Sequence, residues 1–219
     1  MAHAIHNWSN LTIGDKMLDV LKIPPAELFA LLTAIGFAAG LNLYATVAVL
    51  GMLAHFGHLP LPPGLQVLAG WPVIIASTAL FIVEFFADKI PAFDLVWNAL
   101  HTFIRVPVAG LLAYRATSQL TPEHQLLAAL LGAGVALVAH VGKTAARAVV
   151  TPSPEPISNI TLSLGEDALA IGLTWLATRH PYAAGILAAI FIAIVFLSIR
   201  FVFRAMRALF GAAEHEVAL

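Results

Sequence analysis

Six long apolar stretches limit what this chain can fold into more than any other feature. They run through residues 26–56, 70–89, 92–116, 125–150, 157–178 and 181–206. Each is long enough to supply the roughly 20 helical residues that cross a bilayer. Prolines mark most of the turns between them, where one helix must stop and the next begin. The sequence therefore predicts an all-α fold, a polytopic transmembrane helical bundle with about six spanning helices.

Composition and charge support a membrane location. Hydrophobic residues make up 60% of the 219 residues and charged residues 11%, whereas soluble domains contain about 45–50% and about 25%. A soluble core of this size could not bury that excess. The formal net charge is −1, and cysteine is absent. We therefore expect the lipid bilayer as a partner and no nucleic acid, and we exclude disulfides, thiolate metal sites and cysteine nucleophiles.

The domain plan is one bundle with two tails. We expect an N-terminal tail over 1–25 that contains an interfacial helix over 15–23. The transmembrane bundle follows over 26–206, and a cytoplasmic tail covers 207–219. The stretch 26–56 is longer than one crossing needs, so it should tilt or break.

Glycine and proline indicate where helices should depart from simple crossings. Gly36 and Gly40 would help the first stretch to break, and Pro107 predicts a kink in the third. Re-entrant or broken segments near 90–107 and 152–167 are the main alternative to six plain crossings.

Basic residues gather on one side of this layout. Six crossings with both termini cytoplasmic place eight of them on or near the cytoplasmic side: Lys16, Lys22, Lys89, Lys143, Arg147, Arg200, Arg204 and Arg207. Only Arg115 and Arg179 fall on the other side. An excess of Lys and Arg marks cytoplasmic loops. The expected location is thus a bacterial inner membrane, with a multi-pass chain and both termini cytoplasmic.

Four of the predicted helices carry polar residues at helical spacing. The second has Glu84 and Asp88; the third has Asp94, Asn98, His101 and Arg105; the fourth has His140, Lys143 and Arg147; and the fifth has Asn159, Ser163 and Glu166, with Asp167 adjacent. A charge at the bilayer centre costs at least ~2.5–3.5 kcal/mol on insertion scales. Each set lies on one face of its helix. We therefore expect the four polar faces to meet inside the bundle.

Depth along the helices predicts where these side chains lie. His101 is ten residues beyond Pro91, and Glu166 is ten beyond Pro156, which is about 15 Å and near the midplane. His140 reaches a similar depth from the other direction. We expect His101, His140, Glu166 and Asp167 to converge there. The residues expected around the cytoplasmic entrance are Asp88, Lys89, Asp94, Lys143, Arg147 and Glu155.

The residue types leave several chemistries open. Histidines and carboxylates at mid-depth suit a proton relay, and His101, His140, Glu166 and Asp167 could instead bind a divalent metal. The Lys and Arg residues suit an anion or a phosphate head group. Alternatively, Glu166 or Asp167 could pair with Arg105 only to hold helices together. No cofactor is expected, and no hydrolase, protease or nucleotide motif indicates an enzyme.

The polar residues also belong to short, uncommon sequence motifs. They are Ala39-Gly40-Leu41-Asn42-Leu43-Tyr44; Glu84-Phe85-Phe86-Ala87-Asp88-Lys89-Ile90-Pro91; Asp94, Trp97 and His101-Thr102-Phe103-Ile104-Arg105; His140, Lys143 and Arg147; and Ser153-Pro154-Glu155-Pro156-Ile157-Ser158-Asn159 with Ser163-Leu164-Gly165-Glu166-Asp167. Over residues 30–180 the chain resembles the bacterial membrane family catalogued as domain of unknown function 4126. The resemblance implies a polytopic membrane protein and suggests that these motifs are the signature of the family. It supplies no activity.

The leading functional hypothesis is a small transporter or permease, proton-coupled, for an ion or small anion. Similar outlines of the hairpins 70–116 and 125–178 hint at an internal repeat, which is common in transporters. The candidate pathway residues are Asn42, Glu84, Asp88, Lys89, Asp94, Asn98, His101, Arg105, His140, Lys143, Arg147, Glu155, Ser158, Asn159, Ser163, Glu166 and Asp167. The alternatives are a protein that handles lipid head groups or lipid phosphate, and a non-catalytic membrane scaffold. A homo-oligomer is compatible with each.

Overall fold

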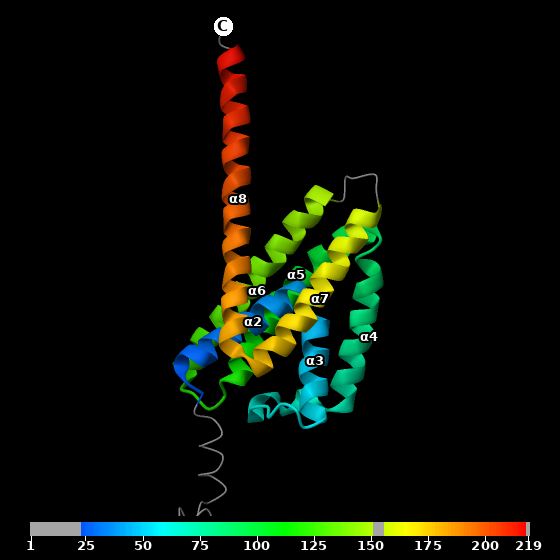
Figure 1. Cartoon of the computed structure of the whole chain (residues 1–219), viewed down its shortest axis with the longest axis vertical. Helices are drawn as coiled ribbons and strands as arrows, with labels where there is room; N and C mark the ends of the chain where they lie inside the picture. The colour runs from blue at the N-terminus through cyan, green and yellow to red at the C-terminus, as the bar shows by residue number, and fades with distance from the viewer. Residues whose placement is uncertain (1–22, 151–155, 218–219) are drawn as a thin grey trace, which may run out of the picture.

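The chain folds into a bundle of helices, with no strand among the residues that the structure describes (Figure 1). This computed structural model describes the backbone of 23–150 and 156–217, and side chains within 23–90, 97–147, 157–204 and 207. The elements are α2 (Pro25–Leu41), α3 (Leu43–His55), the 3₁₀ helix η1 (Pro63–Ala69), α4 (Trp71–Ala87), α5 (Pro91–Ala116), α6 (Pro122–Val150), α7 (Pro156–Arg179) and α8 (Pro181–Val217). The predicted interfacial helix before Pro24 lies outside the described residues.

Prolines set where most of the helices begin. Proline is the first residue of α2, α5, α6, α7 and α8, and Pro72 is the second residue of α4. Proline suits this position because its fixed φ matches the helix, and the N–H it lacks would have no helical partner there. The helices predicted from residue 70 onward are therefore confirmed with boundaries shifted by a few residues, except that α8 continues beyond 206.

The first apolar stretch breaks at Asn42. This residue has an extended backbone, with φ −147° and ψ 101°. Its Oδ1 accepts a hydrogen bond of 2.9 Å from the backbone N–H of Ala45 and so caps α3. The predicted break is present, but an asparagine makes it rather than the glycines.

Gly36 and Gly40 instead allow α2 to pack closely on α6. A Cβ at Gly36 would lie 3.1 Å from the carbonyl oxygen of Gly132, and one at Gly40 would lie 2.7 Å from the Cβ of Ala139. Small residues permit such close backbone approach between membrane helices. Because the later residue of α2 faces the later residues of α6, these two helices run in the same direction.

The helix α3 runs back along α7. Asn42 donates to Asp167, and Thr174 donates to Thr46, so α3 and α7 share a direction. Since α6 and α7 are consecutive and run in opposite directions, α2 and α3 also oppose each other. In Figure 1, α2 rises from the lower left and α3 descends beside α4. The stretch 26–56 is therefore a hairpin that turns back inside the bundle, and not the predicted single crossing.

This hairpin changes the predicted topology. Three helices are long and apolar enough to cross a membrane, over 122–147, 157–179 and 181–204, and the pair η1 and α4, bent by 66°, would be a fourth. The prediction of about six crossings is not confirmed. The start of α2 and the end of α8 lie at opposite ends of the described chain (Figure 1). The orientation of both termini stays a prediction.

The breaks predicted elsewhere are not found at the described positions. The helix α5 runs unbroken from Pro91 to Ala116, with Pro107 inside it, and α7 runs unbroken from Pro156 to Arg179. The departures from straight helices are instead at Asn42 and between η1 and α4. Residues 151–155 lie outside the described part of the chain.

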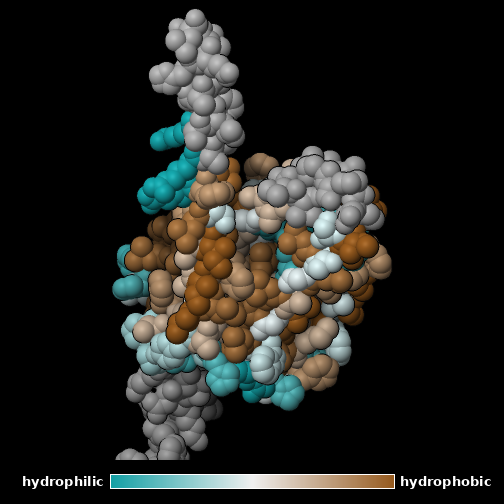
Figure 2. All heavy atoms as spheres, turned by 45° about the horizontal axis from the view of Figure 1, so that its top comes forward, coloured by the Kyte–Doolittle hydropathy of each residue, from teal (hydrophilic) through white to brown (hydrophobic). Residues whose placement is uncertain are grey.

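The outer surface of the bundle is apolar. Large side chains such as Phe103, Phe201 and Ile157 are 82%, 73% and 71% exposed. Figure 2 shows brown, apolar atoms over most of the side of the bundle, with polar atoms at its lower edge and near the far end of α8. Such a surface is stable in lipid and not in water. Together with the spanning helices, it indicates a membrane protein.

The close packing of α2 on α6 generates a first prediction. We expect Gly40→Ala to lower the free energy of unfolding in detergent by about 1–3 kcal/mol, because the added methyl would overlap Ala136 and Ala139. The matched control is Gly172→Ala, where a Cβ would meet nothing within 4 Å. An equal stability of the two variants would contradict the packing described here.

Candidate functional site

The polar faces of α4, α5, α6 and α7 meet in the interior of the bundle. The charged side chains among them are buried: Glu84, Asp88, Arg105, Lys143, Arg147, Glu166 and Asp167. Lipid covers the outside of these helices, so the polar faces turn inward, where they can replace water for one another. The structure thus brings together most of the side chains that sequence spacing singled out.

Two basic residues of α6 hold three helices together. Lys143 Nζ lies 3.4 Å from Glu84 Oε1, 2.9 Å from Asp88 Oδ2 and 3.6 Å from Glu166 Oε2. Arg147 Nη2 lies 2.9 Å from Asp88 Oδ2 and 2.5 Å from Glu166 Oε2. Each carboxylate is thereby shared between two cations. This sharing is what allows so many charges to be buried.

The third cation, Arg105 of α5, pairs with Glu84 and is fully buried. Its Nη1 also donates to Asn98 Oδ1 at 3.4 Å. The predicted pairing of Arg105 with Glu166 or Asp167 is therefore wrong. Helical spacing shows which face a residue occupies, but it does not show which neighbouring helix that face meets.

Several residues expected around an open entrance are buried instead. Asp88, Lys143 and Arg147 lie within the ionic network and are at most 3% exposed. Lys89 lies at the end of α4, where its Nζ donates to Phe85 O at 2.6 Å and lies 3.1 Å from the centre of the Phe85 ring. The side chain of Asp94 and all of Glu155 lie outside the described residues.

His101 connects α5 to the hairpin. Its Nδ1 lies 2.7 Å from Trp97 O and must donate, because a carbonyl oxygen only accepts. Its Nε2 lies 2.9 Å from Tyr44 Oη and accepts from it in the neutral ring. The indole of Trp97 stacks on the imidazole at 4.2 Å between ring centroids. These contacts fix both the tautomer and the orientation of the ring.

His140 connects α6 to α5. Its Nδ1 lies 3.1 Å from Arg105 Nη1, which can only donate, so this nitrogen accepts. Its Nε2–H donates to Thr102 Oγ1 at 2.7 Å, and Thr102 Oγ1 donates in turn to Asn98 O at 3.1 Å. The ring is therefore held as the Nε2–H tautomer. A proton added at Nδ1 would face the guanidinium of Arg105.

The predicted metal site is not assembled. His101 binds Tyr44, His140 binds Thr102 and Arg105, and Glu166 binds Arg147. Asp167 binds Asn42 on another side. No group of three His, Asp or Glu side chains in the described chain is placed to hold one metal ion. These two histidines and two carboxylates lie in the same region of the bundle, but each is hydrogen-bonded to a different partner, so they do not form one ligand set.

The broken helix contributes its two ends to the network. Lys143 Nζ donates to Leu41 O at 3.2 Å, at the C-terminal end of α2. Asn42 Nδ2 donates to Asp167 Oδ1 at 2.9 Å, at the N-terminal end of α3. A helix C-terminus is partially negative and an N-terminus partially positive. The break therefore places the cation Lys143 at the partially negative end of α2. It places the carboxyl group of Asp167 at the partially positive end of α3.

The remaining candidates take supporting positions, and two residues were missed. Asn159 Nδ2 donates to Asp88 O at 3.4 Å, Ser163 is buried and Ser158 is half-buried. Sequence reasoning did not place Tyr44 or Thr102 in the site, although both contact its histidines. Tyr44 lies two residues after Asn42 and Thr102 directly follows His101, and this closeness to a polar candidate is the signal that could have identified them.

The network has more buried carboxyl groups than cations. Within the described residues there are four carboxyls, from Glu84, Asp88, Glu166 and Asp167, and three cations, from Arg105, Lys143 and Arg147. With all of them ionised, the network would carry one net negative charge. A buried excess charge is costly, so this site favours the uptake of one positive charge.

The model of the family described as a domain of unknown function (DUF4126) matches residues 29–201. The chain belongs to this family. The match runs from α2 into α8 and includes every member of the buried network. No curated protein and no solved structure matches the chain. For this DUF4126 protein the arrangement of the site itself must therefore carry any functional argument.

Breaking one pair tests the network. We expect Glu84→Gln to lower the free energy of unfolding in detergent by about 3–5 kcal/mol, because Arg105 would remain buried without its carboxylate. The double variant Glu84→Gln with Arg105→Gln should lose less than the sum of the two single variants. Exposed Glu123→Gln is the control, with an expected change within about 0.5 kcal/mol. If the losses in unfolding free energy of the two single variants simply added up in the double variant, the pairing of Glu84 with Arg105 would be contradicted.

Proposed function

We propose that this DUF4126 protein is a small membrane transporter or permease that moves a cation through the bundle interior. The observation that carries the proposal is the helix break at Asn42, which lies against a buried network with an excess of carboxyl groups. Transporters commonly bind ions where a spanning segment is broken and helix ends face the site. Non-helical backbone at membrane depth is found where it is buried in protein or lines a cavity.

A cation is favoured over the anion that the basic residues first suggested. Arg105, Lys143 and Arg147 all have carboxylate partners. An anion would have to displace one of these partners and would add to an existing negative excess. A proton or a small monovalent cation would neutralise that excess instead.

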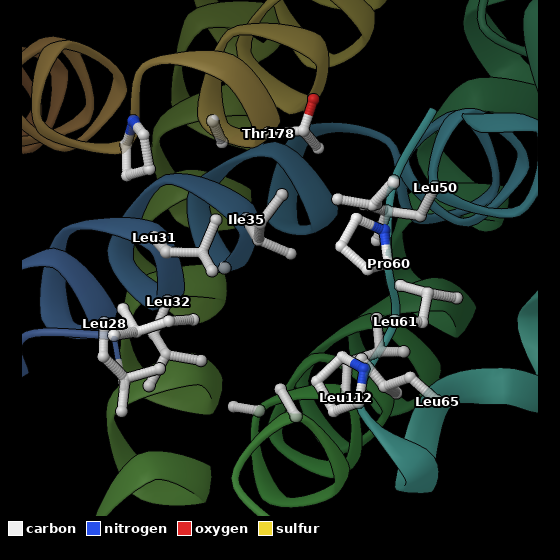
Figure 3. Close-up of a pocket in the computed structure, with 18 of the residues that line it drawn as sticks. Leu28, Leu31, Leu32, Ile35, Leu50, Pro60, Leu61, Leu65, Leu112 and Thr178 are labelled. Atoms are coloured by element: carbon white, nitrogen blue, oxygen red, sulfur yellow. The ribbon is translucent and has the colours of Figure 1, made fainter. Parts of the chain in front are cut away.

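Handling of lipid phosphate has less support. The cavity in Figure 3 has a volume of about 550 Å³ and lies between α2, the segment 59–66 and the ends of α5 and α7. Its described lining is mostly leucine, proline and alanine; Glu27 is charged, and no lysine or arginine takes part. It also lies at the end of α5 and α7 away from the network. A phosphate head group would find no cation in it.

A purely structural role does not account for the network. Buried ion pairs are weak contributors to stability, and apolar residues of similar size often stabilise a protein as well or better. Six ion-paired side chains inside a membrane bundle are therefore costly to keep if they only join helices. Polar groups at this depth usually mark ion or substrate pathways.

Ion flux into vesicles tests the proposal. The purified protein is reconstituted in liposomes, and an outward potassium gradient with valinomycin provides an inside-negative driving potential. An internal pH-sensitive dye reports proton uptake, and radioactive sodium reports Na⁺ uptake in parallel. We expect proton or Na⁺ uptake at least ten-fold above protein-free vesicles. Asn42→Leu should reduce it to background, because it removes both the α3 cap and the Asp167 contact.

The control for this assay is Glu123→Gln, which lies on the exposed first turn of α6 and should keep wild-type flux. Wild-type vesicles that accumulate neither protons nor Na⁺ above protein-free vesicles would overturn the proposal. A normal flux in Asn42→Leu would show that the pathway does not pass the helix break.

A further inference from the structure

One of the four buried carboxyl groups differs from the other three. Glu84, Asp88 and Glu166 each lie within 4 Å of two cations. Asp167 forms no ion pair in the described chain, although it is only 4% exposed. Its Oδ1 accepts from Asn42 Nδ2, whereas its Oδ2 is buried with no hydrogen-bond partner.

Charged groups act on Asp167 from several elements without pairing with it. They are Lys143 on α6, Glu84 on α4, and Asp88 and Lys89 in the turn after α4. Glu166 precedes it on α7 and is paired with Arg147. The three cations within the network are already matched by three carboxylates. An ionised Asp167 would therefore be the fourth negative charge of this buried network, without a cation in ion-pair contact.

Two opposing effects act on this carboxyl group. The N-terminal end of α3 and the amide of Asn42 favour its ionised form. Burial without a cation favours its neutral form, and for a buried ion this is the larger effect. The neutral form has an O–H that needs an acceptor. Ser163 Oγ, one turn earlier on the same face of α7, is also buried without a partner, although no hydrogen bond joins it to Asp167 in the described conformation.

We infer that Asp167 carries an exchangeable proton, and that the cation moved by this protein is H⁺. The inference rests on the proposed transport function and names its ion. In the described conformation Asp167 is neutral and holds the proton on Oδ2. On release, the Oδ2–H bond breaks, the electron pair stays on the carboxylate and the proton passes to water on one side. Uptake from the other side restores the neutral acid.

Infrared spectroscopy of the full chain in proteoliposomes tests the protonation directly. We expect wild-type protein at neutral pH to show the C=O stretch of a buried protonated carboxyl group. This band should be absent in Asp167→Asn and unchanged in Glu123→Gln. Asn42→Leu should keep the band but shift it to higher frequency, since the hydrogen bond that the carboxyl group accepts from Asn42 Nδ2 is lost. Asn42→Leu also keeps the test available if Asp167→Asn fails to fold.

Flux measurements test the ion. Asp167→Asn should reduce potential-driven proton uptake at least ten-fold, and Asp167→Glu should restore part of it. A band that persists in Asp167→Asn, or one that Asn42→Leu leaves unshifted, would overturn the inference even if cations are transported. Sodium uptake at any pH without proton movement would overturn it in the same way. A correct band with no flux of any cation would instead overturn the transport proposal and leave a protonated Asp167.

Discussion

The six ion-paired side chains in the bundle interior are the constraint on which the rest of the architecture depends. A charge withdrawn from water costs several kcal/mol unless protein groups replace the water. Lys143 reaches Leu41 O at the end of α2, Asp88 at the end of α4 and Glu166 on α7, so one ammonium group fixes where three elements meet. Leu41 O is free to accept from that ammonium because α2 ends there and no later helical N–H uses it. The break at Asn42 satisfies the network and caps the next helix with the same residue.

Local sequence signals predicted the elements well and their arrangement only in part. Prolines identified the helix starts because proline suits the first turn, and helical spacing identified the inward faces of α4 to α7 because charges avoid lipid. Hydropathy could not show that 26–56 turns back, since it measures affinity for lipid and carries no information on direction. The partners of Arg105 and Asp167 depend on how whole helices are rotated and which ones are neighbours. Spacing within one helix does not contain that information.

The hairpin also alters the argument from basic residues. The predicted orientation counted Lys16 and Lys22 with the residues that follow the second and fourth stretches, which required 26–56 to cross the membrane. If the chain enters and leaves by the same side at α2 and α3, those two lysines move to the side of Arg115 and Arg179. In addition, Lys143 and Arg147 are buried in the network and serve as ion-pair partners rather than as loop charges. Four basic residues, Lys89, Arg200, Arg204 and Arg207, then stand against four on the other side, so the count of basic residues no longer favours either orientation.

The long reach of the contacts made by the α2–α3 hairpin has a consequence for biogenesis. Asn42 and its partner Asp167 are 125 residues apart in the sequence, and Leu41 and its partner Lys143 are 102 residues apart. During synthesis the hairpin leaves the ribosome before α6 and α7, so the polar groups at its tip lack these partners until both helices have been made. The hairpin can therefore settle at its final depth only after the later helices have entered the bilayer. Assembly of the bundle thus ends with its N-terminal part, and truncation before α7 would leave that part without a place to dock.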